Sequence, residues 1–423
     1  MTKHHCCPIL LLLIVTLSGE AAVYPTAGPR STDNDDSCDI ALLPAATLLL
    51  PYYEVEFGAG GKTTLFTVMN VSHTERIAHV TLWTDHRFPL LTFDLRLAPY
   101  DARSINLYDV IAGGRIESCD GTQTLSAEVL ARLRKAITKG IIYVGSESCD
   151  QISGAGPNAI GFATIDLVAS CTTLTPEDPA YYTEAIRFDN VLAGDYQHVD
   201  PRQGTAEGSS LVHIRAIPEG SDAATRSLDP RFQTNFPNTF YGRYQDPARL
   251  KLDGRQPLPT AFAVPWEADT HRGIATSYTI WHEAESVTSR RCEGRWVNDY
   301  ARLFLTEMVH FDAEENPQRE TVSSGVYYPY GTETKAAGRY ANDLLPTSFD
   351  PRYEHSGWVY FNFREIHSSG RKAQAWVIAT RSEGRTASAR DTAALGNGCS
   401  PSPTPSETPY GGGALGPAPN VNP

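Results

Sequence analysis

The sequence predicts a mainly β protein of two β-sandwich domains of the immunoglobulin-like type, with one helical insertion and a disordered C-terminal tail. Short segments of alternating apolar and polar residues recur along the chain, and the short turn-forming stretches between them leave no room for the helices that a parallel sheet needs. About 400 residues follow the apolar N-terminal segment, which is too many for a single compact core.

Residues 90–97, LLTFDLRL, show this alternation most clearly. Successive side chains of a β-strand point to opposite faces of its sheet. We therefore expect one set of side chains to be buried and the other set to face water. The buried set is Leu91, Phe93, Leu95 and Leu97, and the exposed set is Thr92, Asp94 and Arg96.

The first domain is predicted over residues 46–217, after an extended polar lead-in at residues 23–45. Its segments are rich in β-branched and aromatic residues, and turn residues such as those of GAGGK separate them. This spacing is typical of an antiparallel sandwich or barrel. The expected strands lie within residues 47–57, 63–71, 78–83, 90–97, 104–111, 140–146, 161–169 and 210–220.

One helix is predicted near residues 122–139. Apolar residues recur there every four positions, at Leu125, Val129, Leu133 and Ile137. Gly140 follows as a C-terminal stop signal.

The second domain is predicted over residues 261–395. A loop-rich junction at residues 218–260, marked by repeated prolines, precedes it. Its clearest expected strands lie within residues 276–284, 301–312, 356–366 and 373–382. Residues 396–423 are dense in Pro, Gly and Ser and nearly free of core residues, so we expect them to be disordered.

Part of the second region echoes the first. Pro51, Tyr52 and Tyr53 are followed by TTLFTVMN, and Pro265 and Trp266 are followed by TSYTIWHE. The segment AHVTL likewise parallels ARLFL, with an added loop that carries Cys292. A duplicated sandwich module would explain these matches, and a chance similarity between two pairs of strands would explain them as well.

Residues 1–22 are predicted to be a signal peptide. Lys3 provides a basic start, residues 9–17 are almost all apolar, and small residues at positions 19, 21 and 22 suit cleavage. The apolar run is too short to cross a bilayer, and Cys6 and Cys7 precede it, whereas a lipid-modified cysteine would follow it. We therefore expect an exported protein, extracellular, at the cell surface or periplasmic, with no membrane span in the mature chain.

Removal of Cys6 and Cys7 from the eight cysteines leaves six. An even number in an exported protein indicates up to three disulfides, in any of 15 connectivities. Cys119 and Cys149 flank the expected helix and are our predicted pair. No CxxC pair occurs, so we expect no metal site. The disulfide candidates are Cys38, Cys119, Cys149, Cys171, Cys292 and Cys399.

The formal net charge of −13 argues against binding to nucleic acid, because that binding depends on Lys and Arg neutralising phosphates. The arginines are scattered, with no basic run. The glycines of GAGGK lie between two expected strands and precede no helix, so they predict a hairpin turn and no phosphate-binding loop.

Catalytic signatures are weak. No GxSxG elbow with its strand and helix occurs, and WHEAES lacks the second histidine of a zincin. We interpret His79, His213, His282 and His310 as exposed or partly buried strand histidines without a metal role, and we expect no cofactor. A glycosidase needs only two carboxylates that face a cleft. The residues available for that role are Asp189, Asp195, Glu307, Asp312, Glu314 and Glu315, which turns and solvated rims also explain.

Adjacent tyrosines form clusters near prolines. Neighbouring side chains of an extended chain point to opposite sides, so we expect at least one ring of each pair to be exposed for contact with a sugar or a protein. Packing at the edge of a sandwich is the alternative. The candidate binding aromatics are Tyr52, Tyr53, Tyr181, Tyr182, Tyr327, Tyr328 and Tyr330.

The segments TTLFTVMNVS, HVTLWTD, LAGDY, SLVHIRAIPEG and RQPLPTAFA resemble those of a group of predicted-secreted bacterial proteins without an established function. The resemblance extends from about residue 44 to about residue 385, and it implies a bacterial origin and export. Our functional prediction is an exported, non-catalytic binding or structural protein, whose partner is a cell-surface protein or a carbohydrate. The alternative is a secreted hydrolase that acts on carbohydrate through a carboxylate pair.

Overall fold

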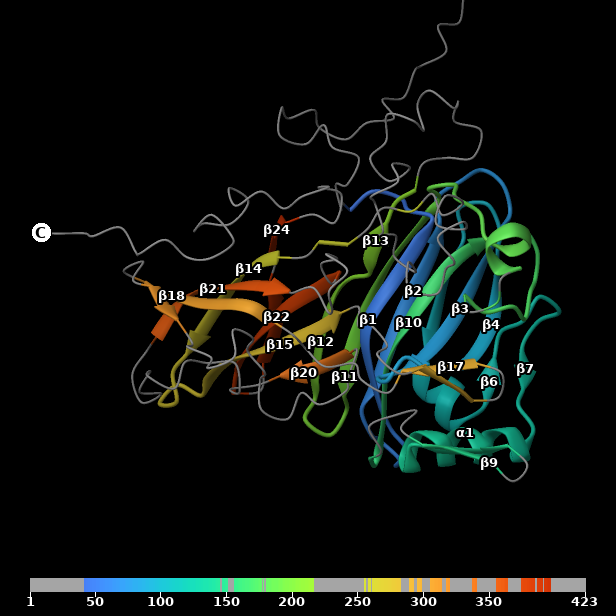
Figure 1. Ribbon diagram of the computed structural model, residues 1–423, viewed down its shortest axis with the longest axis horizontal. Coiled ribbons are helices and arrows are strands. Elements are labelled where there is room, and N and C mark those ends of the chain that lie inside the picture. Colours follow the sequence, from blue (N-terminus) through green and yellow to red (C-terminus); the bar gives the residue numbers. More distant parts are fainter. Residues whose placement is uncertain are drawn as a thin grey trace, which may run out of the picture. The chain divides into compact units, whose positions relative to one another are not determined.

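The fold is described from a computed structural model. It describes residues 42–144, 147–150, 156–176, 178, 180–216, 255, 258–259, 261–282, 289–292, 295–298, 305–313, 317–319, 337–340, 355–363, 374–384, 386–390 and 392–396. The predicted signal peptide and almost all of the lead-in, the junction and the tail lie outside these residues. The described part is mainly antiparallel β-sheet, as the alternation predicts (Figure 1).

Two sheets form what we call the N-terminal sheet pair, and all their strand pairings are antiparallel. The five-stranded sheet has the order β13 (Val212–Ile214), β1 (Thr47–Glu56), β10 (Asn158–Val168), β3 (Arg76–Thr84) and β4 (Pro89–Leu97). The four-stranded sheet has the order β12 (Thr205–Ser210), β11 (Leu192–Asp200), β2 (Thr63–Asn70) and β5 (Ala102–Asn106).

The C-terminal sheet pair is built in the same way. Its five-stranded sheet has the order β19 (Pro317–Arg319), β18 (Leu305–Asp312), β21 (His355–Phe363), β14 (Ala261–Ala268) and β24 (Ala393–Gly396). Its four-stranded sheet has the order β20 (Ala337–Tyr340), β15 (Ile274–His282), β22 (Ala375–Glu383) and β23 (Thr386–Arg390).

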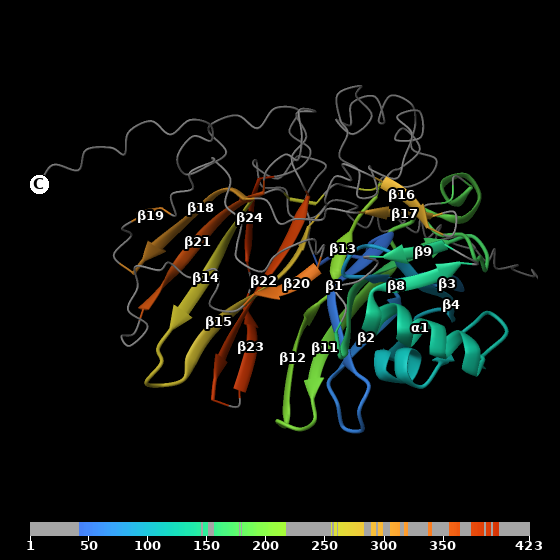
Figure 2. The same ribbon diagram turned by 60° about the horizontal axis from the view of Figure 1, so that its bottom comes forward.

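Smaller elements connect some of these strands along the chain (Figure 2). Two hairpins and a helix separate β5 from β10, and a third hairpin separates β15 from β18. The hairpins are β6 (Arg115–Ile116) with β7 (Gln123–Thr124), β8 (Ile141–Val144) with β9 (Glu147–Asp150), and β16 (Ser289–Cys292) with β17 (Arg295–Asn298). The helix is α1 (Ala127–Lys139), and two π-helical turns are η1 (Tyr108–Ala112) and η2 (Tyr181–Ala185).

The strand order of the second half repeats that of the first. When β1 is matched with β14, and each following sheet-pair strand with its counterpart in chain order, both sheets have the same neighbours in both halves. The hairpin β16–β17, which carries Cys292, is the added loop that the sequence comparison predicts. The described strands therefore contain one topology twice.

Individual side chains show the same correspondence between the two halves. Tyr53 lies opposite Gly161, and its hydroxyl donates a 2.9 Å hydrogen bond to the carbonyl oxygen of Trp83. Trp266 lies opposite Gly357, and its Nε1 donates a 3.3 Å hydrogen bond to the carbonyl oxygen of Phe311. In each half an aromatic side chain of one strand (β1 or β14) passes over a glycine of the next strand (β10 or β21). It donates to a carbonyl oxygen of the strand beyond (β3 or β18).

The threonine after the first turn is also equivalent in the two halves. Thr64 Oγ1 accepts from the amide of Glu54 and donates to its carbonyl, and Thr276 Oγ1 does the same with Glu267. Thr64 therefore matches Thr276, one position away from the match that the sequence comparison proposes. The irregularity in β1 between Leu50 and Tyr53 adds the residue that makes PYYE one longer than PWE.

A hydrophobic cluster lies between the two sheets of the N-terminal pair. It combines Leu48, Val80 and Phe93 of the five-stranded sheet with Phe66 and Tyr196 of the four-stranded sheet, all at most 4% exposed. Burial of the Tyr53 phenol in the same cluster, and secondarily the charge of Asp85, raises its pKa. An equivalent cluster in the C-terminal pair contains Phe262, Tyr278 and Phe361.

The outer face of the N-terminal five-stranded sheet is buried as well. A second cluster covers it, which includes η2 residues, Leu258 of the segment between the two sheet pairs and Trp281 of β15. The ring of Trp281 stands edge-on to Phe162 at 5.9 Å, and the Arg87 guanidinium lies 5.8 Å from its centre. This sheet therefore lacks the solvated face that antiparallel sheets commonly have.

That second buried face corrects the expectation for residues 90–97. Phe93, Leu95 and Leu97 are buried as predicted, and Arg96 is exposed. Leu91 and Thr92 are half-buried, so the predictions for these two are wrong. Asp94 was expected in water, but it is 7% exposed, because its face of the sheet is covered. His79, His213, His282 and His310 are also buried, and the prediction of exposed or partly buried histidines is wrong for all four.

The helix prediction is right in kind, and its start is wrong. Ser126 is the N-cap, with its side chain accepting from the amide of Val129, and Gly140 ends the helix at a φ of 64°. Gln123 and Thr124 pair with β6 instead of continuing the helix. The strand expected at 104–111 likewise ends at Asn106, and η1 follows. Within the described residues, no helix is long and apolar enough to span a bilayer.

Candidate functional site

A row of polar side chains crosses the outer face of the N-terminal five-stranded sheet. Antiparallel registers place Thr47 opposite Asp166, Asp166 opposite His79, and His79 opposite Asp94. Directly opposite residues project to the same face, so these four side chains are neighbours. All four are buried.

Asp166 is the acceptor at the centre of this row. It accepts hydrogen bonds from Thr47 Oγ1 and from the hydroxyl of Tyr181. Arg255 Nη1 lies 3.1 Å from its carboxylate, and both side chains of this ion pair are 0% exposed. Arg255 comes from the segment between the two sheet pairs, so the buried charge pair joins that segment to the N-terminal sheet.

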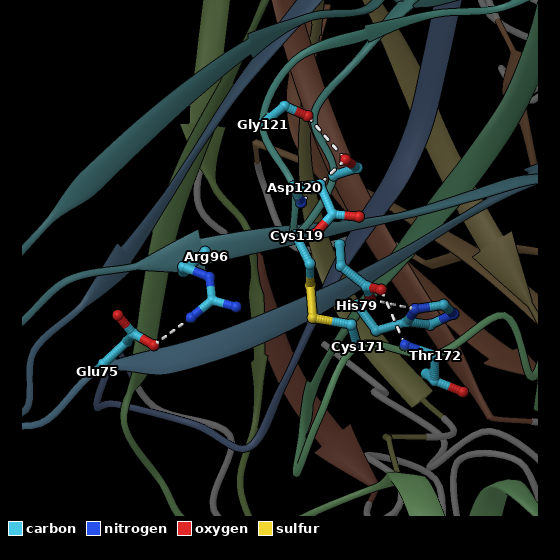
Figure 3. Close-up of a disulfide and its surroundings, with 10 residues drawn as sticks. Glu75, His79, Arg96, Cys119, Asp120, Gly121, Cys171 and Thr172 are labelled. Atoms are coloured by element: carbon cyan, nitrogen blue, oxygen red, sulfur yellow. Dashed lines mark hydrogen bonds and ion pairs between the residues drawn. A yellow bond between two sulfur atoms is a disulfide. The ribbon is translucent and has the colours of Figure 1, made fainter.

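Asp94 ends the row beside a disulfide. Figure 3 shows this disulfide, between Cys119 and Cys171, with His79 and Thr172 next to it. His79 Nδ1 lies 2.7 Å from Asp94 Oδ1, and the amide of Thr172 donates a 2.9 Å hydrogen bond to Asp94 Oδ2. A carboxylate only accepts, so Nδ1 carries the hydrogen of the first bond. The His79 ring lies 5.8 Å from the ring of Tyr181, and its Nε2 has no hydrogen-bond partner in the described structure.

The disulfide joins Cys119 to Cys171, with their Cα atoms 6.2 Å apart. The predicted pairing of Cys119 with Cys149 is wrong. Cys149 lies in β9 opposite Ile142, whereas Cys171 comes shortly after the end of β10, beside Asp94. Proximity to a helix in the sequence does not determine which strand ends meet. The side chains of Cys38, Cys149, Cys292 and Cys399 lie outside the described structure.

The disulfide and Asp94 form the group that we call the sulfur–carboxylate cluster. One carboxylate oxygen of Asp94 and the Sγ atoms of Cys119 and Cys171 all lie within 4.8 Å of one another. Sequence reasoning missed this group, because its members are far apart in the chain and contain no CxxC spacing. The sequence signal for this group was limited to Asp94, one acidic residue in a segment of regular alternation.

The four predicted binding tyrosines that the structure describes are buried, contrary to the expectation of an exposed ring in each pair. Tyr52, Tyr53, Tyr181 and Tyr182 are at most 6% exposed. Both faces of β1 are covered, so Tyr53 is fully enclosed and Tyr52 keeps only a small exposed area, which lines a cleft. The second pair belongs to a π-helical turn and not to an extended strand. Tyr327, Tyr328 and Tyr330 lie outside the described residues.

The predicted carboxylates are distributed over several elements. Asp189 is ion-paired with Arg76 at 3.1 Å, and Asp195 is an exposed residue of β11. Glu307 and Asp312 belong to β18 of the other sheet pair, and Glu314 and Glu315 lie outside the described residues. Of the three whose side chains are described, Asp189, Asp195 and Asp312, none lines the cleft described next.

An open cleft of about 240 Å³ lies where strands of both sheet pairs meet, and we call it the inter-sheet cleft. On the N-terminal side it is lined by residues of β1, β2, β11 and β12, and on the C-terminal side by residues of β15, β22 and β23. The lining residues are Tyr52, Glu54, Lys62, Thr63, His198, Val199, Asp200, Gln203, Thr205, Ala206, Glu207, Ser277, Thr380, Ser382, Gly384, Thr386 and Ala387.

The N-terminal wall of the cleft is held in place by hydrogen bonds. His198 Nδ1 lies 2.9 Å from Thr64 Oγ1, and the ring of Tyr52 stands edge-on to the His198 ring at 5.6 Å. Glu54 accepts a 2.6 Å hydrogen bond from Asn158, and it lies 3.6 Å from Lys62 Nζ. His198 also stands opposite Glu207 on β12. The wall therefore presents carboxylates, an imidazole and one aromatic ring.

The C-terminal wall is different in chemistry. It presents the hydroxyl side chains of Ser277, Thr380, Ser382 and Thr386. Glu267, the repeat equivalent of Glu54, does not line the cleft and is bound by Arg381 and Arg390 at 2.7 Å. The hydrogen bond from Arg381, reinforced by the charges of both arginines, lowers the pKa of Glu267.

Comparisons of the chain with protein-family models, with curated proteins and with solved structures find no match.

Proposed function

We propose that this chain is an exported, non-catalytic binding protein of two β-sandwich domains, and that it binds a small neutral polar ligand in the inter-sheet cleft. A single sugar unit of a surface carbohydrate is the ligand class that we assign. The observation that carries the proposal is the composition of the cleft: hydroxyls from one sheet pair face carboxylates, an imidazole and a tyrosine from the other.

The chemistry of a sugar suits this lining. Its hydroxyls both donate and accept, so they pair with carboxylates and with serine or threonine hydroxyls, while its C–H face packs on an aromatic ring. The volume of about 240 Å³ is below the range of drug-sized pockets, which indicates a small ligand. Both halves contribute to the wall, so an isolated half would lose much of the site.

Export is the second part of the proposal. The disulfide between Cys119 and Cys171 supports it, because such bonds persist in oxidising compartments and are rare in the cytosol. The signal peptide expected at residues 1–22 also indicates export.

The test is calorimetric titration of the purified protein with a panel of neutral mono- and disaccharides. The variant Ala387→Trp places a large ring in the cleft and should abolish binding. Ser388→Trp is the matched control: it lies next on the same strand, is exposed and does not line the cleft, so it should leave the affinity unchanged. A panel without any binding sugar, or equal affinities of the two variants, would refute the proposal.

A further inference from the structure

The sulfur–carboxylate cluster places a buried carboxylate beside two sulfur atoms. Asp94 is 7% exposed, and its hydrogen-bond partners among the described residues are His79 and the amide of Thr172. No Lys or Arg of the described chain contacts it. A buried carboxylate usually has a cationic partner, because removal of its charge from water is costly.

His79 supplies a second, independent observation. Its side chain is 0% exposed, and its Nε2 has no hydrogen-bond partner in the described part of the chain. Its Nδ1 is bound to Asp94, which keeps this carboxylate of β4 oriented next to Cys119 and Cys171. Polar partners behind a ligating group are a regular feature of metal sites, where they hold that group in position.

We propose that the reduced form of this cluster binds Zn²⁺ through the thiolates of Cys119 and Cys171 and the carboxylate of Asp94, with water as the fourth ligand. Thiolate and carboxylate are established Zn²⁺ ligands, at bond lengths of about 2.3 Å and about 2.0 Å. In a tetrahedron with such bonds, ligand atoms are about 3.5–3.8 Å apart. The separations of up to 4.8 Å between carboxylate oxygen and sulfur are close to this, and the sulfurs part when their bond is broken.

The Cys119–Cys171 bond must be reduced before the metal binds, and we assign a dithiol as the reductant. The dithiol gives two electrons and two protons to the S–S bond, so that two thiols form, and it becomes a cyclic disulfide. Zn²⁺ then replaces the two thiol protons, which pass to the solvent. The same two cysteines thus form a covalent crosslink under oxidising conditions and a metal site under reducing conditions.

The test uses the full chain, reduced anaerobically with a phosphine, which is oxidised to its oxide, and titrated with Co²⁺ as a spectroscopic substitute for Zn²⁺. We expect one equivalent of Co²⁺ to produce thiolate charge-transfer and tetrahedral d–d bands, and Zn²⁺ to displace it. The oxidised protein should produce neither band. Reduced protein without these bands would overturn the proposal.

Variants distinguish this cluster from the other cysteines. Cys119→Ser with Cys171→Ser should abolish the bands, whereas the matched control Cys149→Ser with Cys292→Ser should retain them. Asp94→Asn should weaken Zn²⁺ affinity by at least tenfold, in the range observed when a supporting or ligating group is lost. Bands that persist without Cys119 and Cys171 would refute the assignment.

X-ray absorption of the Zn²⁺-loaded wild type keeps the test independent of whether the variants fold. Two sulfur and two oxygen scatterers would support the site, and four sulfurs would refute it.

Discussion

Gly161 is the position where one added methyl group tests the fold most directly. It lies in the centre of the N-terminal five-stranded sheet, opposite Tyr53 on β1 and Thr84 on β3. A Cβ at this position would overlap the carbonyl oxygen of Trp83 and come within 2.7 Å of the Tyr53 hydroxyl oxygen. Both atoms belong to the hydrogen bond that Tyr53 makes across the glycine.

The expected cost of Gly161→Ala has two sources. Overpacking of a close-packed core costs about 1–3 kcal/mol, because backbone and ring must shift. If the shift breaks the Tyr53 hydrogen bond, a buried hydroxyl without a partner costs about 1–3 kcal/mol more. We therefore expect the free energy of unfolding to fall by about 2–6 kcal/mol.

Urea unfolding monitored by tryptophan fluorescence measures this loss. Gly156→Ala is the control, because a Cβ there meets nothing within 4 Å, and its stability should stay within about 1 kcal/mol of the wild type. Gly357→Ala should resemble Gly161→Ala, since the added Cβ would overlap the Phe311 carbonyl oxygen. A loss below about 1 kcal/mol at Gly161 would refute the close-approach argument.

Three further predictions concern charges and the crosslink. Asp166→Asn should destabilise the protein by about 3–5 kcal/mol in the same assay, because it removes the carboxylate charge that lies 3.1 Å from the fully buried Arg255, and an unchanged midpoint would contradict this. Glu267→Gln should cost stability at about pH 7 and much less at about pH 3. Because Arg381 lowers the pKa of Glu267 in the folded state below its ordinary value of 4.5, the stabilisation is complete above that value and disappears as the pH falls through the folded-state pKa. A gap between wild type and variant that stays constant across this range would refute the ion-pair role. Cys119→Ser should reduce the free energy of unfolding by about 4 kcal/mol, from the chain entropy of a loop whose ends are 52 residues apart, and a reductant should produce a similar loss in the wild type and little in the variant.

An exchange of two aromatic side chains shows how the two halves can differ in sequence and share one topology. In the N-terminal half the stacked pair is Trp83 on β3 with Phe162 on β10, and in the C-terminal half it is Phe311 on β18 with Trp358 on β21. The indole and the phenyl ring have exchanged strands, so their combined volume is conserved although neither position is. Cores tolerate such volume-conserving exchanges.

Sequence comparison alone does not detect this exchange. A residue-by-residue comparison registers two mismatches at these positions, and the register of the strands is needed to recognise one conserved pair. The same holds for Tyr53 and Trp266, whose donors differ in chemistry and reach equivalent carbonyl oxygens.

Local patterns in the sequence determined the elements. Alternation located many strands of both halves, because a strand that faces a core must place apolar residues at every second position. It missed β11 and β12, which lie in a stretch without regular alternation. Gly140 ended the helix and GAGGK formed a hairpin turn, since both need backbone conformations that glycine adopts easily. The echo between Pro51 and Pro265 was visible as well, apart from the one-residue irregularity in β1.

Only the tertiary structure decided which surfaces are covered and which distant residues meet. Asp94 and Tyr52 occupy positions that alternation assigns to water or to an exposed edge, and both are buried because a second layer covers the outer face of their sheet. The Cys119–Cys171 bond and the inter-sheet cleft likewise join segments far apart in the chain. A period-two pattern describes one strand and its two faces, and it contains no information about what packs on the second face.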